Sequence, residues 1–292
     1  MGFIDLHVHS NASDGTLSPR KVVQLAYGRK LDAIALTDHD TVAGVEEALV
    51  AAQELSSAPG SHKLEVIPGI ELSCVYQGTE IHILGMFVDD KNESFTGALT
   101  QLREIREERN NEMIRRFCED GMGITREELM AGNPHTVITR AHFARVLVAK
   151  NYAGTMDQAF KKYLQYGGRY CLRKEKISPE RAMEILALGH AFPVLAHPMQ
   201  YKLGYKEIET LVQLLIPLGL GGIEAYHSSN NQYESGKLKD MANAYHLVTS
   251  GGSDFHGSNK PDIDIGTGRG GLRLSHLLLN DMKEAYEHGR NL

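Results

Sequence analysis

Short runs of apolar and β-branched residues alternate with helical segments over most of this chain, and that alternation limits the folds it can adopt. Seven of these runs are predicted to be strands, at residues 3–9, 33–38, 64–72, 80–88, 192–198, 221–227 and 246–256. Strands that alternate with helices build βαβ units and a mostly parallel sheet. Seven or eight parallel strands in this arrangement favour a closed barrel over an open sheet.

The link between the third and fourth predicted strands breaks the pattern. It consists of SCVYQGT at 73–79, which is too short for a helical crossover between parallel strands. The barrel should therefore be distorted at this point. We predict an α/β fold, a distorted (β/α)7 barrel.

The middle of the chain is helical and almost free of strand-like runs. A long helix is predicted to end near Gly121, which suits a C-cap, and further helices are expected near 125–131, 139–150, 156–166 and 178–189. We predict that residues 1–91 and 190–292 form the barrel domain. Residues 92–189 would then form an inserted helical subdomain that acts as a lid and reads the substrate.

Composition excludes several classes of protein. The 292 residues are 42% hydrophobic and 23% charged, as in ordinary globular proteins, and no apolar run reaches the roughly 18 residues of a membrane span. The first residues do not resemble a secretory signal, and the three cysteines, Cys74, Cys118 and Cys171, form no CxxC pair. We expect a cytoplasmic protein with reduced thiols, no membrane contact and no stable protein partner.

The net charge of −6 argues against a general nucleic-acid coat, which needs a basic surface. A phosphorylated substrate is still compatible with this charge if bound metal supplies local positive charge.

Histidine and carboxylate side chains gather where the predicted strands end. His7 and His9 are an i, i+2 pair and so share one face of a strand, and Asp254 and His256 repeat this spacing. The remaining members lie at or just after other strands: Asp14, His39, Glu71, His82 and His197. In α/β barrels the carboxyl ends of the strands meet at one mouth.

One histidine on an apolar strand is usually a packed core residue. Packing alone gives no reason to place polar groups at the same end of six strands, and burying so many titratable groups without a cation is costly. The pattern therefore indicates a metal centre.

These residues lie in motifs that resemble those of the PHP (polymerase and histidinol phosphatase) family. The motifs are MGFIDLHVHSNASDG, ALTDHD, PGIELS, IHILG, LAHP and SGGSDFHG, and the resemblance covers about two-thirds of the chain. It implies a barrel like that of the amidohydrolases, with a trinuclear metal site. The first metal would use His7, His9, Glu71 and Asp254, and the second Glu71, His82 and His197. The third would use Asp14, His39 and His256.

The resemblance implies three divalent ions, with Mn2+ the first choice and Fe2+ or Zn2+ the alternatives. Three such ions with three carboxylates leave the site at about +3, enough to attract a phosphate ester. A hydroxide that bridges two metals would attack phosphorus. His227 is a candidate proton donor for the leaving group, with Asp38 and Asp40 as weaker candidates.

The predicted lid carries candidate groups for a second phosphate. Arg103, Arg106 and Arg109 are spaced i, i+3, i+6 on its first helix, where one or two of them could clamp an anion in a bidentate manner. The alternative is a solvated helix with ion pairs to its own glutamates. A second group, His135, Arg140 and His142, lies at a predicted helix start, where backbone amides favour anions.

A third group comprises Arg169, Arg173 and Lys174. For base stacking the candidates are Tyr152, Phe143 and His142, with packing inside the lid as the alternative role of each.

Small PHP proteins with a helical insertion of this kind resemble the 3′,5′-nucleotide bisphosphate phosphatases. The predicted reaction is therefore removal of the 3′-phosphate from a nucleoside 3′,5′-bisphosphate such as pAp. Three alternatives stay open. They are a 5′-to-3′ exoribonuclease acting on short 5′-phosphorylated RNA, an amidohydrolase that cleaves C–N bonds, and a non-catalytic metal-binding module.

Overall fold

The computed structural model describes residues 2–57, 59–165, 167–171 and 177–290. Its strands form one sheet in the order β7-β6-β5-β4-β3-β2-β1-β8. Their bounds are β1 Phe3–Val8, β2 Leu31–Leu36, β3 Glu65–Tyr76, β4 Thr79–Met86, β5 Phe192–Leu195, β6 Gly222–His227, β7 Val248–Gly252 and β8 Leu274–Ser275. All seven predicted strands are present. The two-residue strand β8 was not predicted.

The sheet curves into a nearly closed barrel. The segment after β7 meets β1 through a parallel bridge between Val8 and Phe255. Two backbone hydrogen bonds join these segments, from Asp254 N to the His7 oxygen (2.9 Å) and from His9 N to the Phe255 oxygen (3.0 Å). The predicted barrel fold is therefore confirmed.

The predicted distortion is confirmed as a reversal of one strand. β4 follows β3 as a hairpin and pairs antiparallel with both β3 and β5, whereas the β1–β2, β2–β3, β5–β6 and β6–β7 pairs are parallel. The sheet is mostly parallel, as predicted; the two-residue β8 pairs antiparallel with β1, and β4 runs antiparallel to both of its neighbours. The short 73–79 link is the physical reason, because it cannot carry a crossover.

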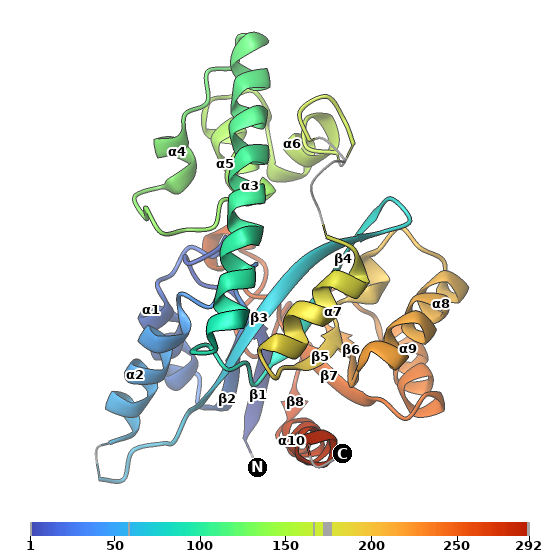
Figure 1. The fold of residues 1–292 in the computed structure, drawn as a ribbon. Helices are drawn as coiled ribbons and strands as arrows, with labels where there is room; N and C mark the ends of the chain where they lie inside the picture. The colour runs from blue at the N-terminus through green and yellow to red at the C-terminus, as the bar shows by residue number, and fades with distance from the viewer. Residues whose placement is uncertain (1, 58, 166, 172–176, 291–292) are drawn as a thin grey trace.

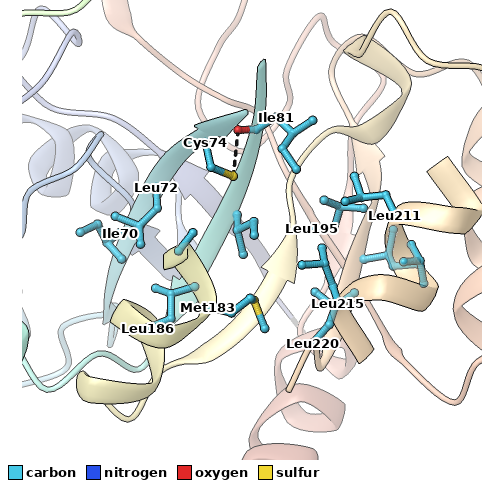
Figure 2. Packing of buried hydrophobic residues seen from close by; sticks show 14 of the residues in the cluster. Ile70, Leu72, Cys74, Ile81, Met183, Leu186, Leu195, Leu211, Leu215 and Leu220 are labelled. Atoms are coloured by element: carbon cyan, nitrogen blue, oxygen red, sulfur yellow. Dashed lines mark hydrogen bonds between the residues drawn. The ribbon is translucent and has the colours of Figure 1, made fainter. Parts of the chain in front are cut away.

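Helices cover the outside of the barrel (Figure 1). They are α1 Pro19–Gly28, α2 Val45–Ser56, α8 Tyr205–Leu215, α9 Gln232–Ala244 and α10 Leu277–Arg290. As the sequence predicts, Ser18 caps α1 and Pro19 opens it. The largest buried cluster lies between the sheet and its helices, where Ile70 and Leu72 of β3 share a core with Leu211 and Leu215 of α8 (Figure 2).

The middle of the chain forms α3 Glu93–Glu119, α4 Arg126–Met130, α5 Arg140–Ala149, α6 Met156–Lys162 and α7 Pro179–Leu188. α3 is long, and α4, α5 and α6 gather around its far end (Figure 1). There, Met113 and Phe117 pack with Phe143 and Leu147 in a core of their own.

The two ends of the 92–189 segment belong to the barrel's packing. Phe95 near the start of α3, and Met183 and Leu186 of α7, lie in the same buried cluster as the β3 residues. The predicted domain boundaries at 91/92 and 189/190 stay a prediction. Within the described residues, no helix is both long enough and apolar enough to span a bilayer.

Candidate metal centre

The nine predicted metal ligands converge at one end of the barrel. His7 lies on β1 and His9 just after it, His39 follows β2, and His197 follows β5. His82 lies near the start of β4, and the reversal of that strand brings it to the same end as the carboxyl ends of its neighbours. His197 and Asp254 have left-handed backbones (φ 27° and 58°), a costly conformation that clusters at functional sites.

Glu71 is the centre of this cluster, and its carboxylate is buried. One oxygen, Oε1, lies 2.8 Å from His82 Nδ1 and 2.9 Å from His197 Nε2. The other, Oε2, lies 3.1 Å from His39 Nδ1, 3.2 Å from His9 Nε2 and 3.4 Å from His7 Nε2. The two oxygens therefore face two different groups of imidazoles, as a bridging carboxylate would.

Asp14 and Asp254 extend the cluster on either side of His9. Asp254 Oδ1 lies 3.4 Å from His9 Nε2, and Asp14 Oδ1 lies 3.2 Å from His256 Nε2. Three groups have ligand atoms within 4.8 Å of one another: His9, Asp14, His39 and His256; His7, His9 and Glu71; and His39, Glu71 and His82.

The donor atoms fit divalent metal ions. Nδ1 of His9 and of His197 is buried with no hydrogen-bond partner among the described residues, a costly arrangement unless another group binds there. Burial lowers the pKa of the His39, His197 and His256 imidazoles. For these three rings this favours the neutral form, which is the form that binds metal, whereas Glu71 and other neighbouring carboxylates raise the pKa of His7, His9 and His82. Mixed imidazole and carboxylate ligands suit Mn2+, Fe2+ and Zn2+.

Glu224 holds two of these ligands in place, and sequence reasoning missed it. Its side chain is fully buried, Oε1 accepts a hydrogen bond from His7 Nδ1 (2.9 Å), and Oε2 accepts one from His197 N (2.7 Å). With the Nδ1 proton of His7 directed to Glu224, His7 Nε2 presents its lone pair to the cluster. The available signal was a carboxylate inside the apolar strand sequence GIEAYH.

The predicted proton donors contact other side chains and do not line the cavity that opens over the cluster. Asp38 accepts hydrogen bonds from the Ser10 and Ser13 hydroxyls, both at 2.6 Å. Asp40 forms an ion pair with Arg106. The buried His227 ring approaches Asp254 Oδ2 through Nε2 at 3.3 Å, with Nδ1 accepting from a backbone N–H. None of Asp38, Asp40 and His227 lines the cavity.

A cavity of about 280 Å³ opens over the cluster. Three arginines from residues 92–189, which we call the helical segment, line this cavity. They are Arg106, Arg109 and Arg140, and we call them the arginine group. Burial, followed by repulsion from Arg109, lowers the pKa of Arg106 to about 9. Such crowding of like charges favours an anion between them.

The arginine group is also paired with acidic residues of the barrel. Arg106 contacts Asp40 after β2, and Arg140 lies 2.5 Å from Glu80 Oε2 on β4. Arg109 is buried and donates to Asn110 Oδ1 at 2.8 Å.

Other predicted substrate-binding residues lie elsewhere. Arg103 and His135 are exposed and outside the cavity. His142 is buried, and its Nδ1 accepts from Thr139 N in the capping box of α5. Arg169 pairs with Asp120, and Arg173 and Lys174 lie outside the described residues.

Among the cavity residues that the sequence did not single out are Lys260 and Phe160. Lys260 Nζ lies 2.5 Å from Asp254 Oδ2, and the Phe160 ring lies beneath the Arg140 guanidinium at 5.8 Å. Both line the cavity. Phe143, considered for base stacking, is buried in the helical core, and Tyr152 packs against that core.

Known proteins are similar to this chain in sequence and in structure. The PHP domain profile matches residues 5–212. A 5′-3′ exoribonuclease of Haemophilus influenzae is 33% identical over 86% of this chain and 89% of its own. A 3′,5′-nucleoside bisphosphate phosphatase of Chromobacterium violaceum is 32% identical over 91% of each chain.

One solved structure resembles this chain in fold over nearly the whole of its length. It is that of an amidohydrolase from Chromobacterium violaceum with bound sulfate and no metal. Its TM-score is 0.83 and its identity 30%, over 97% of this chain and 96% of its own.

Proposed function

Because this chain belongs to the PHP domain family, we propose that it is a metal-dependent phosphatase that removes the 3′-phosphate of nucleoside 3′,5′-bisphosphates. One observation carries the proposal: the metal-binding cluster and the arginine group line the same cavity. A substrate with two phosphates has one anionic group for each end of such a cavity.

The metal end would hold the phosphate that reacts. We propose the nine converging residues as ligands of three divalent ions, with Mn2+ first: His7, His9, Asp14, His39, Glu71, His82, His197, Asp254 and His256. Bound ions of this kind lower the pKa of water and offset charge on phosphoryl oxygens. In the reaction, water adds to phosphorus, the bond to the 3′-oxygen breaks, and that oxygen leaves with a proton. The products are inorganic phosphate and a nucleoside 5′-monophosphate.

The other end would hold the 5′-phosphate and the base. Arg106 and Arg140 present guanidinium groups to the cavity, and such groups bind phosphate in a bidentate manner. Phe160 offers an aromatic face for a base. Lys260 lies beside Asp254 at the metal end, where its ammonium would contact a phosphate oxygen.

A second candidate is a 5′-to-3′ exoribonuclease, and the names of the relatives favour it. Besides the Haemophilus influenzae protein, the exoribonuclease of Escherichia coli is 33% identical over 90% of this chain. The same cavity would then bind the 5′-phosphate of an RNA and cleave the next phosphodiester.

Phosphate release from a panel of substrates after reconstitution with Mn2+ tests these candidates. The panel is pAp, 3′-AMP, 5′-AMP, histidinol phosphate and a 5′-phosphorylated trinucleotide. We expect pAp to be hydrolysed with the highest kcat/KM and 5′-AMP to be inert. Equal rates on pAp and 3′-AMP would contradict a role for the arginine group.

Other outcomes identify the alternatives. Nucleotide release from the trinucleotide at a higher kcat/KM than phosphate release from pAp would favour the exoribonuclease. An amidohydrolase would hydrolyse cyclic amides and would keep its turnover after Arg103, Arg106 and Arg140 are neutralised together. A non-catalytic module would bind Mn2+ and turn over no substrate.

A further inference from the structure

Thr139, the N-cap residue of α5, connects the helical segment to a proposed metal ligand. Its hydroxyl donates a hydrogen bond to Asp14 Oδ2 at 2.9 Å and accepts one from Ala141 N at 3.2 Å. Thr139 is 6% exposed and Asp14 5% exposed. Because this buried hydroxyl both donates and accepts a hydrogen bond, its orientation is fixed.

The segment before Thr139 is fastened to the loop that carries Asp14. Asn133 Nδ2 donates to the Asn11 oxygen (2.6 Å), Val137 N to the Ala12 oxygen (2.9 Å), and the Thr136 hydroxyl to the Ser13 oxygen (2.6 Å). The loop that carries Asp14 is therefore held by residues 133–139 of the helical segment.

The next residue of α5 reaches a ligand on the other side of the cluster. Arg140 lies 2.5 Å from Glu80 Oε2, and Glu80 Oε1 lies 3.2 Å from His82 Nε2. The opposite nitrogen of that ring, His82 Nδ1, faces Glu71. Two consecutive residues at the start of α5 thus contact Asp14 directly and His82 through Glu80.

We propose that the start of α5 positions Asp14 and His82, so that the metal affinity of the barrel depends on the helical segment. The inference rests on the metal centre of the proposed function. With Oδ2 of Asp14 held by Thr139, Oδ1 faces His256 Nε2 at 3.2 Å and His9 Nδ1 at 3.9 Å. Carboxylates and imidazoles that bind metal lose affinity, typically 10–100-fold, when such supporting contacts are removed. Thr139, Arg140 and Glu80 are positioning residues in this role.

Metal binding without substrate tests the role of Thr139. Mn2+ affinity and stoichiometry would be measured by equilibrium dialysis of the full chain as wild type, Thr139→Val, Thr139→Ser and Thr125→Val. Thr125 is the matched control, because it caps α4 with the same capping-box geometry and is exposed, away from the cluster. Both valine variants lose a helix cap, so a general loss of helix stability would affect both.

We expect Thr139→Val to weaken at least one Mn2+ equivalent by about 10-fold. Thr139→Ser keeps the hydroxyl and should restore wild-type affinity, and Thr125→Val should leave affinity unchanged. Equal Mn2+ affinity in Thr139→Val and Thr125→Val would overturn the role of Thr139. A wild-type chain that binds no divalent metal would overturn the proposed function itself, so the two failures are distinguishable.

Arg140→Met tests the second contact in the same assay. Arg126→Met is its control, because Arg126 pairs with Glu107 inside the helical segment. We expect Arg140→Met, and not Arg126→Met, to weaken Mn2+ binding measured without substrate. Unchanged binding in Arg140→Met would remove His82 from the proposal. If Arg126→Met weakened binding equally, the loss would reflect the helical segment as a whole, which would overturn the specific role of Arg140.

Discussion

The metal end and the arginine end of the central cavity differ in how their side chains are held. At the metal end, the predicted ligands come from strands and strand ends, and the buried Glu224 hydrogen-bonds to two of them. At the arginine end, Arg106 and Arg140 come from helices and pair with acidic residues of the barrel. The first arrangement is set mainly by the backbone of the sheet, although Thr139 of the helical segment also contacts Asp14. The second depends on how the helical segment docks on the barrel.

Removing a ligand at the metal end should have the largest effect. His7→Ala and Asp254→Ala should each reduce phosphate release by more than about 100-fold. Loss of a residue that only supports a metal ligand typically costs about 10–100-fold, and loss of the ligand itself should cost more. Phosphate release would be measured with saturating Mn2+, and far-ultraviolet circular dichroism would check that the barrel is folded. Activity that survives both substitutions would contradict the metal assignment.

Weakening a support at the metal end should have the next largest effect. In Glu224→Gln, the amide can accept from only one of His7 Nδ1 and His197 N, and its NH2 then opposes the other donor. We expect Mn2+ affinity to fall by about 10–100-fold, measured by equilibrium dialysis. Wild-type affinity in this variant would show that Glu224 does not orient the ligands.

Changes at the arginine end should affect substrate choice more than turnover. Assayed at a Mn2+ concentration that saturates each variant, so that weaker metal binding in Arg140→Met does not contribute, Arg106→Met and Arg140→Met should each lower kcat/KM for pAp by about 10–100-fold, because a hydrogen bond to a charged group contributes about 1.5–3 kcal/mol. The values for 3′-AMP should change far less. Arg103→Met is the control, since Arg103 lies on the same helix but is exposed. An equal loss of kcat/KM on pAp and on 3′-AMP would show that the arginines support the structure and do not bind the 5′-phosphate.

The smallest expected effect is on the pH dependence of folding stability, through His142 in the first turn of α5. Burial lowers the pKa of His142 to about 4, below its value of about 6.5 in an unfolded chain. The unfolded state therefore binds a proton first as the pH falls, and stability from this residue is lost between about pH 6.5 and 4. Urea unfolding of His142→Gln, which keeps a capping-box acceptor, should show a weaker decline over this range. An identical decline would rule out this contribution from His142.

The sequence was most informative where the spacing of candidate site residues matches the two-residue repeat of a strand. The i, i+2 spacing predicts that His7 and His9 share one face of a strand, and the structure places His7 on β1 and His9 just after it. Asp254 and His256 lie beyond the end of β7, and Asp254 has a left-handed backbone, so the strand repeat does not account for that pair. The short link after β3 predicted the distortion, but not that β4 would run in the opposite direction. Whether the predicted ligands bind metal stays a prediction, but their convergence is a feature of the fold.

The helical segment was less predictable, because a helix presents its charged residues in every direction. Arg103 and Arg106 are one turn apart, yet only Arg106 lines the cavity. His142 resembled an anion-binding residue at a helix start, and the structure shows that it caps that helix. Lys260 and Phe160 carry no local sequence pattern that points to the cavity.

By itself, the sequence determined the positions of seven strands and the barrel class, because the apolar runs that form strands are local in the chain. Only the tertiary structure decided which arginines face the cavity, and that Glu224 and Thr139 contact the predicted ligands. Those contacts join residues separated by 217 positions for Glu224 and His7, and by 125 for Thr139 and Asp14. Their geometry comes from packing between elements, which no local pattern specifies.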